Sequence, residues 1–121
     1  MAPISQPAQA CADAAMPFKC TQPAIATVQS EDANTRITRW DFAPGAATGW
    51  HTHGWPYFVV MLTDAVMRIE AGGAVSEVRL AAGQSYQRPA GIEHDVMNGA
   101  DVPMAFVEIE IKRPEALIAP R

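Results

Sequence analysis

The stretch GQSYQRPAGIEHDVMN (residues 83–98) decides the fold of this chain. It contains two short runs of strand-forming residues, QSYQRP and HDVMN, with the turn Pro89-Ala90-Gly91 between them. Proline fixes φ and glycine tolerates the positive φ values that other residues avoid, so this pair favours a tight reversal. The stretch therefore predicts two neighbouring strands, the second of which carries His94.

The same alternation of short strands and turns continues in both directions from this stretch. The other strand-like runs are TRITRWDF (35–42), YFVVML (57–62), VMRIEA (66–71), VSEVRL (75–80) and MAFVEIEIK (104–112). Short strands at this spacing, bounded by Gly, Asp and Pro, are typical of an antiparallel sandwich or barrel. We predict an all-β domain over residues 26–113. An extended N-terminal arm rich in Ala, Pro and Gln (1–25) precedes it, and a C-terminal tail (114–121) follows.

Composition excludes several classes of partner. The chain has 121 residues, of which 49% are hydrophobic and 18% charged, as in an ordinary globular protein. A net charge of −4 without any Lys/Arg cluster argues against a nucleic-acid partner. No apolar run approaches the ~20 residues that cross a bilayer, and the N-terminus lacks the pattern of a signal peptide. We therefore expect a cytoplasmic protein without a membrane partner, in which Cys11 and Cys20 are free thiols of no assigned role.

The three histidines of the chain are candidates for a metal site. His51 and His53 are two residues apart, so in a strand their side chains lie on the same face. Two imidazoles placed in this way can bind one ion at ~2.0–2.2 Å, and His94 from another strand would supply a third ligand. Taken alone, the His-x-His pair is explained equally well by a surface position.

The chain resembles the cupin family in two sequence motifs. Gly45, His51 and His53 match the first half of one motif, and Gly83, Pro89, Gly91, His94 and Asn98 match every position of the other. The resemblance covers about residues 36–111. It implies a double-stranded β-helix, or jelly-roll barrel, with a metal ion inside its mouth held by His51, His53 and His94. We expect Asn98 to hold a turn through hydrogen bonds to the backbone.

The glutamate of the first motif is missing. Tyr57 or Phe58 occupies its place, depending on the spacing, and the position of the following residues favours Phe58. In the last run, Val107, Ile109 and Ile111 share one face, so we expect Glu108 and Glu110 to point outward. If that strand faced the other way, one of these two glutamates could supply the missing carboxylate.

Three neutral imidazoles leave the full +2 charge on a divalent ion, which favours an anionic, chelating substrate. Imidazole ligands suit Fe(II), with Zn or Ni as alternatives. The resemblance to three-histidine cupins implies a mononuclear non-haem Fe(II) dioxygenase, an oxidoreductase acting on a small organic acid, diketone or thiol. A non-redox Zn or Ni lyase, cyclase or isomerase and a non-catalytic small-molecule-binding cupin are the alternatives. The chain is also similar to small bacterial cupins grouped with β-alanine degradation.

Other residues carry weaker predictions. Tyr57 could act in catalysis by donating a hydrogen bond, or could be core. Arg88 could bind a substrate carboxylate, or could lie on the surface, while Trp50 and Trp55 could wall the substrate pocket or merely pack. We expect Glu93 and Asp95 to be solvated. Exposed strand edges favour a homodimer, and metal affinity should fall below roughly pH 6 as the histidines protonate.

Overall fold

The structure is a computed structural model that describes residues 3–4 and 22–115. Ten strands lie in this part of the chain: β1 (Pro3–Ile4), β2 (Ile25–Glu31), β3 (Thr35–Phe42), β4 (His51–Thr52), β5 (Tyr57–Met61), β6 (Ala65–Ala71), β7 (Ala74–Leu80), β8 (Ser85–Arg88), β9 (Glu93–Asn98) and β10 (Met104–Ile111). The predicted all-β class is confirmed, and the predicted runs match β3, β5, β6, β7 and β10 within one residue at each end. Among these residues, no helix has the length and apolar character needed to span a membrane.

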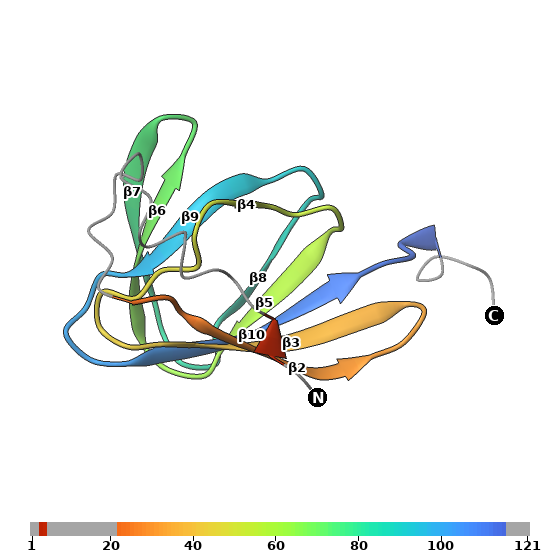
Figure 1. The fold of residues 1–121 in the computed structure, drawn as a ribbon, viewed down its shortest axis with the longest axis horizontal. Helices are drawn as coiled ribbons and strands as arrows, with labels where there is room; N and C mark the ends of the chain where they lie inside the picture. Colours follow the sequence, from red (N-terminus) through yellow and green to blue (C-terminus); the bar gives the residue numbers. More distant parts are fainter. Residues whose placement is uncertain (1–2, 5–21, 116–121) are drawn as a thin grey trace.

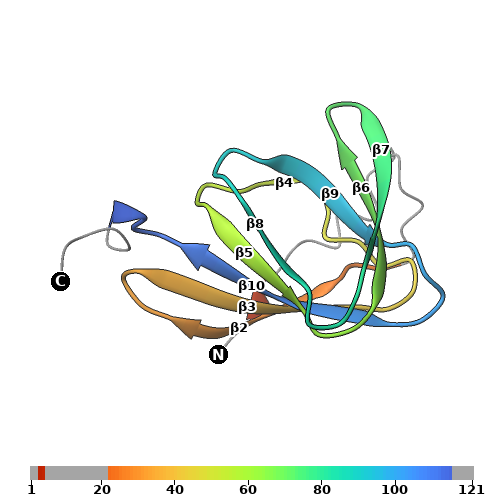
Figure 2. The ribbon, with the colours of Figure 1, turned by 180° about the vertical axis from the view of Figure 1, so that it is seen from behind.

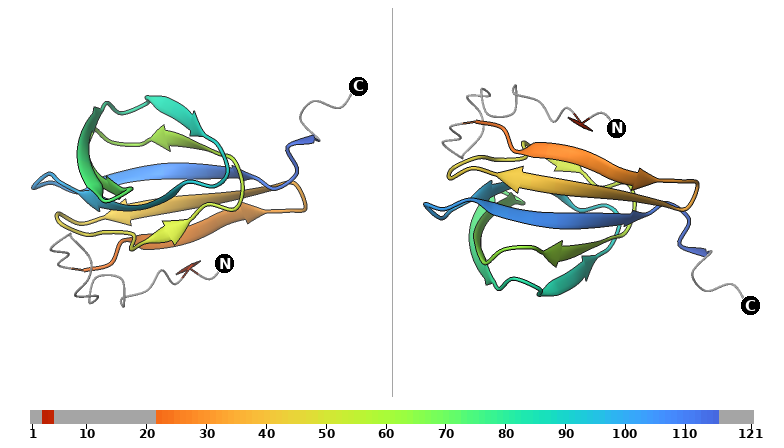
Figure 3. Two further views of the ribbon diagram at one scale, coloured as in Figure 1. Left: turned by 90° about the horizontal axis from the view of Figure 1, so that it is seen from above. Right: turned by 90° about the horizontal axis from the view of Figure 1, so that it is seen from below.

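The strands form two antiparallel sheets that face each other (Figures 1 and 2). One sheet has the order β1-β2-β3-β10-β5-β8 and the other has the order β4-β9-β6-β7. The long strands β2, β3 and β10 lie side by side beneath the smaller sheet (Figure 3). This arrangement agrees with the predicted jelly-roll barrel. The predicted domain boundaries remain predictions, and Cys11 and Cys20 lie outside the described residues.

The core lies between the two sheets. Its largest fully buried apolar side chains are Phe42, Met61, Met67 and Met104. The rings of Phe42 and Phe106 are 5.4 Å apart and tilted, which fits interlocking of inward-facing side chains from neighbouring strands. The methionines therefore fill the core, as predicted, since Met61, Met67, Met97 and Met104 are all buried.

The stretch at 83–98 folds as predicted into β8, a turn and β9. Gly91 has φ of 95°, a value that side-chain-bearing residues rarely adopt. The Asn98 side chain is buried and donates hydrogen bonds from Nδ2 to the carbonyls of Phe42, Ala43 and Val102. It therefore ties the end of β9 to the neighbouring loops, as predicted.

The predicted orientation of the last strand is wrong. Glu108 and Glu110 are 8% and 5% exposed, and they share the inward face of β10 with Met104 and Phe106. Val107 and Ile109 lie half-buried on the outer face instead. Both faces of β10 carry apolar residues, so alternation alone does not distinguish them. Two carboxyl groups therefore enter the barrel.

Candidate metal centre

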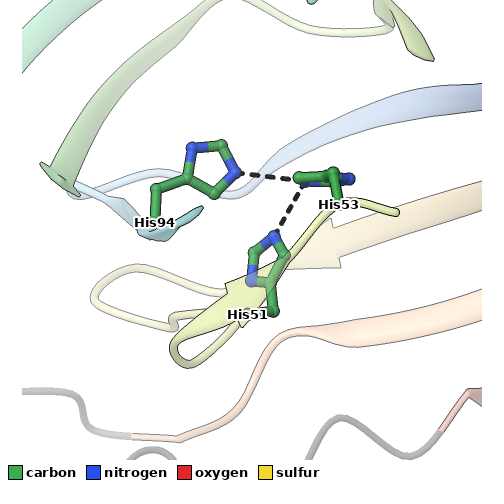
Figure 4. A group of neighbouring side chains, drawn as sticks. All are labelled: His51, His53 and His94. Atoms are coloured by element: carbon green, nitrogen blue, oxygen red, sulfur yellow. Dashed lines mark hydrogen bonds between the residues drawn. The ribbon is translucent and has the colours of Figure 1, made fainter. Parts of the chain in front are cut away.

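The three histidines come together on the smaller sheet (Figure 4). His51 on β4 lies directly opposite His94 on β9 in the antiparallel pairing. His53 follows two residues later, and its backbone N–H and C=O bond to the carbonyl of Ile92 and the N–H of Gly91. The turn that carries Gly91 thus fixes the backbone of His53 as well as the position of His94. The rings converge from β4, the segment after it, and β9.

The spacing of the ring nitrogens fits a single metal ion. His53 Nε2 lies 3.0 Å from His51 Nε2 and 3.2 Å from His94 Nε2. Two nitrogens that bind one ion at about 2.1 Å are about 3.0 Å apart at a right angle and about 3.4 Å apart at the tetrahedral angle. The observed distances lie between these values. A three-nitrogen set of this kind covers one side of an ion and leaves the other side open to further ligands.

Hydrogen bonds orient His51 for this role. Its Nδ1–H donates a hydrogen bond to the Gly49 carbonyl at 2.7 Å, which leaves the Nε2 lone pair directed toward the other histidines. The Gly49 N–H in turn donates to Asp95 Oδ1 at 3.1 Å. Asp95 is completely buried, so the prediction that it is solvated is wrong, whereas Glu93 is exposed as expected. Burial raises the pKa of Asp95 to about 6.

Burial keeps the imidazoles neutral. It lowers the pKa of His53 and of His94 to about 3, with a further contribution from the neighbouring His51, and it also lowers the pKa of His51. A neutral imidazole is the form that binds a metal ion. The site therefore has its ligands in the metal-binding protonation state at neutral pH.

Tyr57, not Phe58, faces the histidines. Tyr57 is 2% exposed and its ring stacks on His53 with a centroid distance of 3.8 Å, whereas Phe58 is 37% exposed. The assignment of Phe58 to the place of the missing glutamate is therefore wrong. The inward position holds the tyrosine, because side chains alternate along β5. Burial raises the pKa of Tyr57 above its ordinary value, so its hydroxyl is a hydrogen-bond donor.

Carboxylates approach the site from β10 instead. Glu108 and Glu110 lie within 4.8 Å of a ring nitrogen of His53 and of each other. Among the described residues they form such a group with His53 and not with all three histidines. Two atoms bound to one ion at about 2.1 Å are at most about 4.2 Å apart. The two carboxylates are thus grouped with His53 and not with His51 and His94.

The two glutamates have different surroundings. Arg36 on β3 lies directly across from Glu110, and its Nε is 2.8 Å from Glu110 Oε1. Glu108 forms no ion pair of this kind within the described part of the chain, and burial together with the charge of Glu110 raises its pKa to about 8. One carboxyl group is thus held in an ion pair, and its neighbour retains a proton at neutral pH.

A cleft of about 780 Å³ leads to His94, and its walls come from β6, β7, β8 and the turn before β9. Arg88 and Trp50 line it, together with Tyr57 and Tyr86. Arg88 lies opposite Tyr57 in the β5–β8 pairing, close enough to His94 to contribute to the lowering of its pKa. Its role in binding a substrate remains a prediction.

Trp55 does not line this cleft. Its ring lies beside two cations, with the guanidinium carbon of Arg36 at 5.1 Å and Lys112 Nζ at 5.5 Å from the ring centroid. Trp55 thus packs against the Arg36–Glu110 ion pair. This position does not support the prediction that Trp55 contacts the substrate. From the sequence, Glu108 and Glu110 are expected to point outward unless the last strand faces the other way, and no sequence signal marks Arg36 as a neighbour of the site.

Comparison with known proteins gives consistent matches. Residues 38–110 match the family model described as Cupin domain. The beta-alanine degradation protein BauB of Pseudomonas aeruginosa is 47% identical over 89 residues, which are 74% of this chain and 94% of that protein. The crystal structure of a cupin domain from Bordetella pertussis Tohama I has a TM-score of 0.73 and 43% identity, covering 75% of this chain and 95% of that one. The protein TT1209 from Thermus thermophilus shares the fold, with a TM-score of 0.62, 22% identity, and coverage of 76% and 86%.

Proposed function

The chain belongs to the cupin family, and from that premise we propose that it is a mononuclear metal enzyme acting on a small organic acid, diketone or thiol. His51, His53 and His94 would hold one divalent transition metal ion, with Fe(II) favoured. The observation that carries the proposal is the convergence of the three Nε2 atoms at 3.0 and 3.2 Å spacing. A bound Fe(II) ion would supply activation of O2, which makes dioxygenase chemistry the first candidate.

The charges around the cleft support an anionic substrate. Three neutral imidazoles do not neutralise a divalent ion, so an anion is attracted to it. Arg88 lines the cleft near His94 and can bind a carboxylate through two parallel hydrogen bonds. The name of the relative BauB mentions β-alanine, itself a small carboxylate. We therefore place the substrate carboxylate at Arg88 and its reacting carbon toward the histidines.

Tyr57 would act on the substrate as a hydrogen-bond donor. Its ring is fixed by stacking on His53, and the rise in its pKa keeps the hydroxyl protonated. Tyr57 lines the cleft beside the buried side chains of Met67 and Leu80, and apolar surroundings of this kind strengthen a hydrogen bond.

Elemental analysis of the purified full chain tests the proposal. We expect about one iron per chain and oxygen uptake with acetylacetone, 3-mercaptopropionate or a small oxo acid. The variant His94→Gln should lose both metal and oxygen uptake, while Glu77→Gln, a change at an exposed residue of β7, should keep both. A wild-type protein without stoichiometric metal would refute the metal site.

Glu108 favours a second candidate, a non-redox enzyme that uses Zn or Ni. Lyases and isomerases need a group that moves a proton near the metal, and Glu108 is a buried carboxyl group within 4.8 Å of His53. Stoichiometric zinc or nickel without oxygen uptake would support this candidate over the dioxygenase.

A further inference from the structure

A small inner cavity lies at the end of the cleft, beside the three histidines. Its volume is about 20 Å³, enough for about one water molecule. His51, His94 and Glu108 all line it, and it shares Tyr57 and Tyr86 with the cleft. An atom in this cavity would therefore contact both the metal site and the carboxyl group of Glu108.

Buried polar groups without a well-formed hydrogen bond surround Glu108. Among the described residues, Trp40 Nε1 and Thr38 Oγ1 are buried and lack a partner in hydrogen-bond geometry, although Trp40 lies near enough to Glu108 to favour its charged form. Trp40 lines the inner cavity, and Thr38 lies directly across from Glu108 on β3. Buried donors of this kind are rare in proteins without a polar group to bind. Trp40 Nε1 is therefore a donor beside Glu108 on the wall of the cavity, placed to stabilise the Glu108 carboxylate when it has lost its proton.

We propose that Glu108 is the proton-transfer residue of this site, exchanging a proton with a small carbonyl compound bound beside the three histidines. The inference rests on the proposed function, because the carbonyl oxygen would bind at the metal. Glu108 takes a proton from the carbon next to the carbonyl, and the electron pair of that C–H bond forms the enolate. The return of the proton from the Glu108 carboxylic acid to that carbon reverses the step.

The surroundings of the two glutamates support different roles for them, an ion pair for Glu110 and proton transfer for Glu108. Arg36 is held by Glu110 through a 2.8 Å contact, and within the part of the chain that the structure describes Glu108 forms no ion pair. Glu108 lines the inner cavity together with His51 and His94, so its carboxyl group lies within reach of a C–H bond of a compound bound at the histidines. Among the described residues, charged and titratable groups face Glu108 from several strands: Arg36 on β3, His51 on β4, His53 after β4, Tyr57 on β5, Tyr86 on β8, His94 on β9 and Glu110 on β10.

Deuterium exchange into pyruvate tests the proposal without knowledge of the natural substrate. The full chain is loaded with zinc, which has no redox chemistry, and incubated with pyruvate in D2O at pH 8 while proton NMR follows the methyl signal. Wild-type protein should accelerate exchange over the same concentration of free zinc. Glu108→Gln should lower the accelerated rate by about 100-fold or more while keeping one zinc per chain. Glu77→Gln, with the same chemical change at an exposed position, should match the wild type.

Infrared spectroscopy of the metal-free protein gives a second readout. The wild-type spectrum minus that of Glu108→Gln at pH 7 should contain the C=O band of one protonated carboxyl group. Equal exchange by Glu108→Gln and wild type, no acceleration by zinc-loaded wild type, or absence of that band would overturn the proposal while leaving the metal site in place. A wild-type protein that binds no zinc would instead refute the proposed function, and this inference with it.

Discussion

Glu108→Gln should make the metal-free protein more stable in alkaline solution. The pKa of Glu108 is about 8 in the folded protein, against an ordinary value of 4.5, so the folded state binds one more proton than the unfolded state between these values. The stability that this proton contributes is fully present below pH 4.5 and is lost as the pH rises from there through 8. Glutamine carries no charge at any pH, so the stability of the variant does not fall with rising pH in this way.

The size of the effect follows from the two pKa values. Between pH 6.5 and pH 8 the wild type should lose about 1.7 kcal/mol of unfolding free energy through Glu108. For a domain of this length, that loss lowers the melting temperature by roughly 5–8 °C. The lowered pKa values of His53 and His94 lie below this range, and their effects also cancel in the comparison of two variants.

The assay is thermal unfolding of chelator-treated protein, followed by circular dichroism at several pH values from 6.5 to 8.5. We expect the melting temperature of the wild type to fall relative to that of Glu108→Gln as the pH rises. Glu77→Gln should follow the wild type, because the Glu77 side chain is 52% exposed. Parallel curves for wild type and Glu108→Gln would refute the protonated state of Glu108 at neutral pH.

Four further predictions concern the metal, the ion pair and the assembly. Replacing a ligand histidine, as in His94→Gln, should lower bound zinc below one per chain by elemental analysis while the far-UV spectrum stays unchanged. Arg36→Met leaves Glu110 buried without its cation and should lower the unfolding free energy in urea by up to about 3 kcal/mol, which the double variant with Glu110→Met should recover. The sequence predicts a fall in metal affinity below roughly pH 6, but burial lowers the pKa of His53 and His94 to about 3, so we correct this prediction: the folded protein should still hold zinc at pH 5 in equilibrium dialysis, and half-loss near pH 6 would contradict the correction. The homodimer remains a prediction, and sedimentation of the full chain as a monomer would contradict it.

The parts of the fold that the sequence predicts well are those with strong local signals. The Pro89–Gly91 turn and the strand lengths follow from residue types within a few positions, and the structure agrees with them. The convergence of His51, His53 and His94 came from the resemblance to a family together with the same-face rule for residues two apart. These features can be predicted without knowing how the two sheets pack against each other.

The orientation of β10 could not be predicted in this way. Its outer face carries Val107 and Ile109, and its inner face carries Phe106 beside two glutamates, so hydrophobicity favours the wrong face. The orientation of β10 is set instead by its pairing with β3 on one side and β5 on the other, in the centre of the sheet. The place of Asp95 was missed for a similar reason, since its partner Gly49 lies 46 positions away in the sequence.

The inward face of β10 carries residues of the apolar core at its beginning and residues of the candidate site at its end. Met104 and Phe106 at its beginning pack with Phe42 and Met61 in the apolar core, whereas Glu108 and Glu110 at its end lie beside His53. Burial of groups that titrate costs folding free energy, which the apolar half offsets. Because Phe106 lies in the apolar core and also lines the inner cavity beside His51 and His94, truncating it to alanine should lower the unfolding free energy measured in urea.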